Sequence, residues 1–123
     1  MDDLSYKVRI SALWILGMIA FFTYRTIAVS EGVTEVSVLS NSELATVLLI
    51  MMVFTFFSLF LKYRFNRLMN IIAGAIFLVL EIAMLVDGLT AYLSQSFNIM
   101  TGATVVLMAA VVWLAIRWPK RQA

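Results

Sequence analysis

The chain of 123 residues contains no cysteine and no histidine. Their absence excludes disulfides, thiol redox chemistry, the usual zinc sites, haem ligation by these side chains and a histidine general base. Nothing among the remaining residues resembles a nucleophile–base pair or a metal-ligand set. We therefore expect no catalytic residue, no cofactor and no metal, and predict that the protein is not an enzyme.

Charge is also scarce: 13% of the residues are charged, whereas 63% are hydrophobic. Soluble domains run at about 25% charged and roughly 45–50% apolar. The apolar residues form four runs, at about 10–29, 44–61, 68–88 and 97–117, each close to the ~20 residues that a helix needs to cross a bilayer. The sequence predicts an all-α membrane protein, with residues 1–123 as a single transmembrane domain.

The first run is expected to be a retained span and not a cleaved signal peptide. The segment before it starts with two aspartates, the run is longer than the 7–15 residues of a signal h-region, and Arg25 interrupts its end.

Basic residues follow a one-sided pattern along the chain. Eight of the nine flank the N-terminus, the junction of the second and third runs, or the C-terminus: Lys7, Arg9, Lys62, Arg64, Arg67, Arg117, Lys120 and Arg121. Positive residues mark the cytoplasmic side, which predicts a four-helix antiparallel bundle with both termini cytoplasmic. The excess of basic over acidic residues is thus explained by membrane topology and not by nucleic-acid binding.

Three local signals mark helix ends. Ser40 followed by Glu43 is a capping box and predicts a helix start. Asn66 is expected to close the turn before the third span in a left-handed conformation, and Pro119 to end the fourth helix.

Three charges fall inside the predicted spans. Counted at 1.5 Å per residue, Arg25 lies about 24 Å beyond Arg9, while Glu81 and Asp87 lie about 21 Å and 30 Å beyond Arg67. A central charge costs at least ~2.5–3.5 kcal/mol on insertion scales, so such residues usually face the bundle and pair. We expect Arg25 to pair with Glu81, Asp87 or both.

Two interpretations of this charge cluster stay open. In one, the charges lock the first helix to the third, or Arg25 reaches outward to Glu31 or Glu35 and Asp87 stays at the interface. In the other, Glu81 exchanges a proton or cation in a cavity, with Arg25 influencing its ionisation.

Small and polar residues recur at helical spacing in all four spans. They either line a narrow cavity or form close helix contacts. The candidates are Tyr24, Thr55, Ser58, Asn70, Gly74, Phe77, Thr101 and Thr104.

The segment from Lys62 to Gly74, KYRFNRLMNIIAG, resembles a family of uncharacterised bacterial four-span membrane proteins that share K-Y-R-x-N-R-x-x-N-I-I-A-G. Ser11-Ala12-Leu13-Trp14 at the start of the first span and the basic C-terminus are similar as well. The resemblance implies a fold and a location in the bacterial inner membrane, and it implies no activity. A more distant similarity to DoxX-like proteins concerns the fold alone.

Together these features predict a non-enzymatic integral membrane protein that handles a small solute, an ion or a proton through a bundle containing Arg25, Glu81 and Asp87. The alternative is a structural or accessory subunit that binds a larger membrane partner. The bilayer is the first expected partner. A chain this short encloses little space, so transport would require a homodimer.

Overall fold

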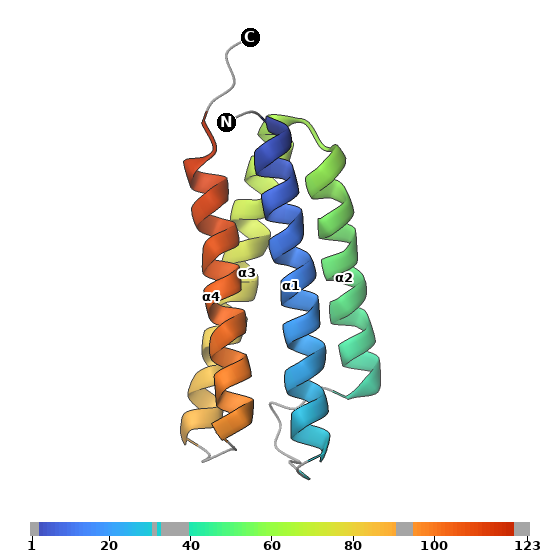
Figure 1. Ribbon diagram of the computed structural model, residues 1–123, viewed down its shortest axis with the longest axis vertical. Coiled ribbons are helices and arrows are strands. Elements are labelled where there is room, and N and C mark those ends of the chain that lie inside the picture. Colours follow the sequence, from blue (N-terminus) through green and yellow to red (C-terminus); the bar gives the residue numbers. More distant parts are fainter. Residues whose placement is uncertain (1–2, 31, 33–39, 91–94, 120–123) are drawn as a thin grey trace.

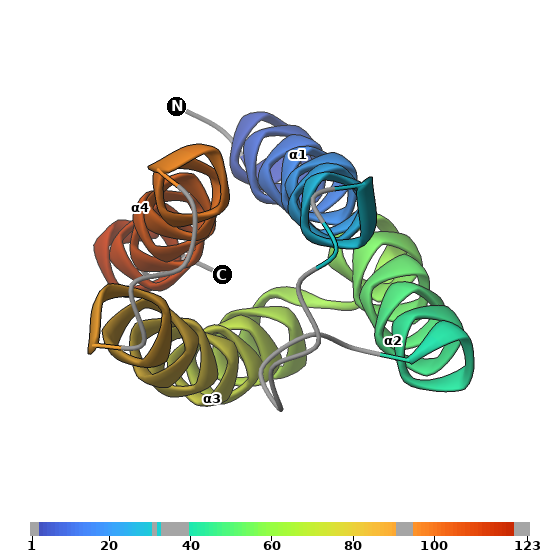
Figure 2. The same ribbon diagram turned by 90° about the horizontal axis from the view of Figure 1, so that it is seen from below.

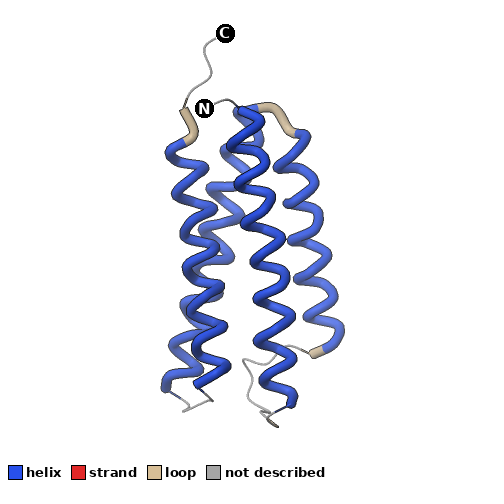
Figure 3. Tube along the Cα trace, in the orientation of Figure 1, coloured by secondary structure: helices blue, strands red, loops and turns tan. Residues whose placement is uncertain are grey.

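Four long helices make up the computed structural model, which describes residues 3–30, 32, 40–90 and 95–119. They are α1 (Asp3–Ser30), α2 (Asn41–Phe60), α3 (Tyr63–Thr90) and α4 (Gln95–Arg117). They lie side by side in one bundle (Figures 1 and 3). Within the described ranges there is no strand, so the all-α prediction is confirmed.

Each helix is long and apolar enough to cross a membrane, over Leu4–Ile27, Asn41–Phe60, Tyr63–Asp87 and Asn98–Arg117. The four predicted runs lie within or overlap these helices, which extend past the apolar residues at several ends. Large apolar side chains are exposed on the outside of every helix, as expected where lipid replaces water.

The start of α2 confirms the predicted capping box. The Ser40 hydroxyl accepts from the backbone N–H of Glu43, and the Glu43 carboxylate accepts from the backbone N–H of Ser40, each at 3.2 Å. Two backbone donors at the helix start are thereby satisfied.

The prediction for Asn66 is wrong. α3 begins at Tyr63, so Asn66 lies inside the helix, and among the described residues only Gly32 has a positive φ. The side chain of Asn66 is fully buried and donates to the carbonyls of Ser58 (2.7 Å) and Leu61 (3.2 Å) at the end of α2. It closes the connection through its side-chain amide and through a backbone hydrogen bond to the Lys62 carbonyl (2.8 Å), and not through a left-handed conformation.

The helices are packed unequally around the bundle. α1 contacts both α2 and α4, and α4 contacts α3, whereas α2 and α3 make few contacts. In Figure 2, α2 and α3 are joined at the far end and lie well apart at the near end. The core is aromatic: Trp14 lies 5.2 Å from Phe54 and 5.5 Å from Phe77, between ring centroids.

Gly74 brings α3 and α4 close together. A Cβ at this position would lie 2.8 Å from Val112 Cγ2 and 3.2 Å from Val111 Cγ1, closer than packed atoms allow. The residue therefore forms a close helix contact, which was one of the two roles considered for the small residues.

Candidate functional site

Glu81 is the most unusual residue in the bundle, because its carboxyl group lies within an apolar span and is fully buried. It shares one side of α3 with Asn70, Gly74 and Phe77, all buried, at spacings of three or four residues. That spacing directs Glu81 into the bundle.

The partner of Glu81 is on α4. The Thr104 hydroxyl oxygen lies 2.5 Å from Glu81 Oε2 and 2.6 Å from the carbonyl oxygen of Thr101, one helical turn earlier. Both threonines are fully buried. The other carboxyl oxygen, Glu81 Oε1, is buried and accepts no hydrogen bond from the described part of the chain.

Tyr24 of α1 lies near the same site. It is fully buried, and its hydroxyl lies 3.5 Å from the sulfur of Met84, one turn beyond Glu81 on α3. The site thus combines the Glu81 carboxyl group, the Thr104 hydroxyl, the Thr101 carbonyl and the Tyr24 phenol, from three helices.

Arg25 and Asp87 lie in other surroundings. Arg25 is half-buried and donates to the Asn41 side chain at the start of α2. Asp87 is exposed near the end of α3. No hydrogen bond or ion pair between described residues joins Arg25 to Glu81 or Asp87, so the predicted pairing has no support among these contacts.

A second polar cluster, the Asn70 network, consists of Trp14, Ser58, Asn66 and Asn70. Asn70 Oδ1 accepts from the Trp14 indole N–H (2.6 Å) and the Ser58 hydroxyl (3.2 Å). The Asn70 amide donates to the carbonyl (2.9 Å) and Oδ1 (2.7 Å) of Asn66. All four side chains are fully buried, and they join α1, α2 and α3.

Trp14 and Asn66 were not among the predicted site residues. A tryptophan inside a span, away from the headgroup region, is a usable signal, because its indole N–H needs a buried acceptor. The partner itself could not be identified from the sequence, since Asn70 is 56 residues away.

The remaining small and polar candidates lie in packed positions. Thr55 is half-buried and donates to the Met51 carbonyl at 2.8 Å, while Phe77 packs edge-on against Trp14 and Phe21. These contacts fit helix packing.

The basic residues that were predicted to set the topology differ in their surroundings. Arg67 donates to the carbonyls of Ala115 (3.0 Å) and Ile116 (3.3 Å), which are left unpaired at the end of α4. Arg117 lies over the Trp113 ring at 4.9 Å. Lys62 and Arg64 are exposed, and Lys120 and Arg121 lie outside the described residues.

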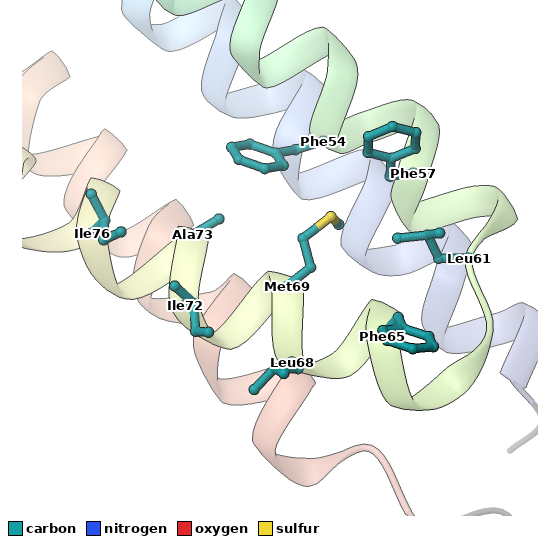
Figure 4. Close-up of a pocket in the computed structure, with 9 residues that line it drawn as sticks. All are labelled: Phe54, Phe57, Leu61, Phe65, Leu68, Met69, Ile72, Ala73 and Ile76. Carbon is teal, nitrogen blue, oxygen red and sulfur yellow. The ribbon is translucent and has the colours of Figure 1, made fainter.

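An apolar hollow of about 560 Å³, which we term the α2–α3 groove, lies where these two helices make few contacts. Phe54 and Phe57 of α2 form one wall together with Leu61, and α3 lines the other wall between Phe65 and Ile76 (Figure 4). Glu81 is not among its lining residues.

No three His, Cys, Asp or Glu side chains in the described ranges are arranged to hold a metal ion. Comparison with known proteins adds no relative: no family model, curated protein or solved structure matches this chain. The resemblance carried by residues 62–74 therefore stays a prediction, and the function has to be argued from the site itself.

Proposed function

We propose that this protein is a non-enzymatic transporter of the bacterial cytoplasmic membrane, in which Glu81 exchanges a proton during movement of a small solute or ion. The observation that carries the proposal is the arrangement of Glu81, Thr104 and Thr101. Intramembrane carboxyl groups that face a bundle interior are typical of proton relays in transporters.

Hydrogen-bond accounting supports a proton on Glu81. The Thr104 hydroxyl has one hydrogen, yet its oxygen lies at hydrogen-bonding distance from two acceptors, Glu81 Oε2 and the Thr101 carbonyl. Both short contacts are satisfied when Thr104 donates to Thr101 and a protonated Glu81 donates to Thr104. The buried carboxyl group then carries no charge, which avoids the cost of an unpaired ion in hydrocarbon.

The structural alternative, an ionic lock between α1 and α3, has less support. Arg25 donates a hydrogen bond to Asn41 on α2, and Glu81 bonds to α4. The Asn70 network already joins α1 to α3 through Trp14. Glu81 is therefore not needed for that connection.

Contacts at the helix ends support the antiparallel topology included in this proposal. Tyr6, near the start of α1, stacks on Trp118 after α4 with ring centroids 5.6 Å apart. Arg67, near the start of α3, reaches the end of α4. The start of α1 and the end of α4 lie at one end of the bundle in Figure 1, together with the α2–α3 connection that carries Lys62. The positive-inside rule assigns this end to the cytoplasm.

The experiment compares Glu81→Gln with the unmodified protein in liposomes that contain a pH-sensitive dye. We expect a membrane potential to drive proton flux through liposomes that contain the unmodified protein. Liposomes that contain Glu81→Gln should show only the background flux of protein-free liposomes. Asp87→Asn is the matched control, because it also removes one carboxylate from α3 but at an exposed position, and it should keep the flux.

Two results would remove the transport proposal: equal flux in Glu81→Gln and the unmodified protein, or no flux above background in either. Infrared difference spectroscopy gives an independent test of the proton itself. A carbonyl stretch of a protonated carboxylic acid should be present in the unmodified protein and lost in Glu81→Gln.

The second candidate is an accessory subunit that binds a larger membrane protein. It is favoured by α2, whose residues are the least buried of the four helices. Single-molecule photobleaching in lipid separates the two candidates, because transport through so small a chain requires a homodimer. Monomers that conduct no protons would favour the accessory role.

A further inference from the structure

The α2–α3 groove has the length of a single lipid leaflet. Its α3 wall runs from Phe65 to Ile76, and these eleven residue steps cover about 16 Å along a helix. Half of a ~30 Å hydrocarbon core is about 15 Å. The groove begins beside the α2–α3 connection, at the end of the bundle where the basic residues gather.

The lining of the groove indicates the kind of occupant. All nine lining side chains are apolar, and Met69 and Ala73 are directed between the helices in Figure 4. An extended hydrocarbon chain finds only apolar contacts there.

Two cations are next to lining residues of the groove in the sequence. Lys62 follows Leu61, and Arg64 precedes Phe65, the two lining residues closest to the α2–α3 connection. Both side chains are exposed, and no described residue forms a hydrogen bond or ion pair with either. Arg67, by contrast, is engaged by the end of α4. The two cations are therefore available to an external anion.

We propose that the α2–α3 groove binds an anionic phospholipid, with one acyl chain between α2 and α3 and the phosphate at Lys62 and Arg64. The length of the groove, its apolar lining and the two exposed cations all match this one ligand. Basic residues beside a span attract anionic headgroups, and a slot between helices adds selection for a chain. The site is separate from Glu81 and does not depend on the transport proposal.

Trp14 provides a built-in reporter, because its ring contacts Phe54, which lines the groove. In the variant Trp113→Phe with Trp118→Phe, Trp14 is the only tryptophan. The protein is placed in phosphatidylcholine vesicles that contain a fixed minor fraction of either dibrominated phosphatidylglycerol or dibrominated phosphatidylcholine. Bromine on a chain in the groove quenches Trp14 fluorescence.

We expect stronger quenching by the brominated phosphatidylglycerol, with a relative affinity on the order of tenfold from two cations. Lys62→Gln with Arg64→Gln should abolish this preference. The matched control Lys7→Gln with Arg9→Gln removes the same charge beside α1 and should keep it. Ala73→Leu, which fills the groove, should weaken quenching by both lipids, and circular dichroism verifies that each variant is folded.

Three outcomes would overturn the proposal. Equal quenching by the two brominated lipids would show that the headgroup is not recognised. Loss of the preference in the Lys7 and Arg9 control as well would assign it to general surface charge. In the third outcome, quenching of Trp14 by both lipids falls as the protein-to-lipid ratio rises, and photobleaching shows dimers. That result would assign the groove to a second copy of the chain.

Discussion

The Asn70 network and the Glu81 site are both buried on α3, yet they differ in how their hydrogen bonds are satisfied. In the network, the Asn70 amide oxygen accepts two hydrogen bonds and the amide nitrogen donates two, all with protein partners. At the second site, the described residues offer Glu81 one hydrogen-bond partner, the Thr104 hydroxyl at Oε2, and none at Oε1. A fully satisfied network fixes helix positions, whereas a carboxyl group with spare capacity can gain or lose a proton.

Removal of the network centre should have the largest effect on stability. Asn70→Ala leaves the Trp14 N–H, the Ser58 hydroxyl and part of the Asn66 amide without partners in an apolar region. We expect a loss of about 2–4 kcal/mol, since each unsatisfied buried group costs ~1–3 kcal/mol and the losses are not additive. Unfolding in mixed micelles of increasing SDS fraction, followed by circular dichroism, measures it.

The control for this change is Thr26→Ala, which removes an exposed hydroxyl that bonds only within α1. Its effect should stay within about 0.5 kcal/mol. If Asn70→Ala were equally mild, the network would not be what holds α1, α2 and α3 together.

Two glycine-to-alanine substitutions test the packing of α3 against α4 between the two sites. Gly74→Ala places a methyl group 2.8 Å from Val112 Cγ2 and should cost about 1–3 kcal/mol through overpacking. Gly102→Ala meets nothing within 4 Å and should be neutral, or stabilising by up to about 1 kcal/mol. The same SDS titration compares the variants, and equal effects would contradict the close contact of α3 with α4.

Substitutions near the end of α4 should have a smaller effect on stability. Arg67→Gln removes donors from the carbonyls of Ala115 and Ile116, and we expect a loss of about 1 kcal/mol. Arg64→Gln, one turn earlier and exposed, should change stability in detergent by less than about 0.5 kcal/mol. A reversed order of the two variants would show that Arg67 serves topology alone.

Hydropathy and capping chemistry were sufficient to predict the four helices, because a span of ~20 apolar residues and the Ser40–Glu43 pair are local features. The partners of Arg25 could not be predicted in the same way. Depth along a helix is one coordinate, and contact also depends on how each helix is rotated about its axis. Arg25 donates a hydrogen bond to Asn41 on α2.

Asn66 shows a second limit of local reasoning. Its tolerance of left-handed backbone indicated a turn, but its amide reaches back to the Ser58 and Leu61 carbonyls, and this tertiary contact keeps the residue helical. Asn70, in contrast, was recognised as a buried polar position, since it shares the spacing of Gly74, Phe77 and Glu81.

The comparison between the two sites is tested most sharply by the substitution with the smallest expected effect on stability. Glu81→Gln keeps the shape of a protonated carboxyl group, and its amide can donate to Thr104 in place of the acid. We expect a change within about 1 kcal/mol in the SDS titration, much less than for Asn70→Ala, because no charge is lost when the acid is already neutral. Thr104→Val removes the shared hydroxyl and serves as the second variant. If Glu81→Gln lost as much stability as Asn70→Ala, the carboxylate would be charged and bound to a structural partner, and the two sites would have the same role.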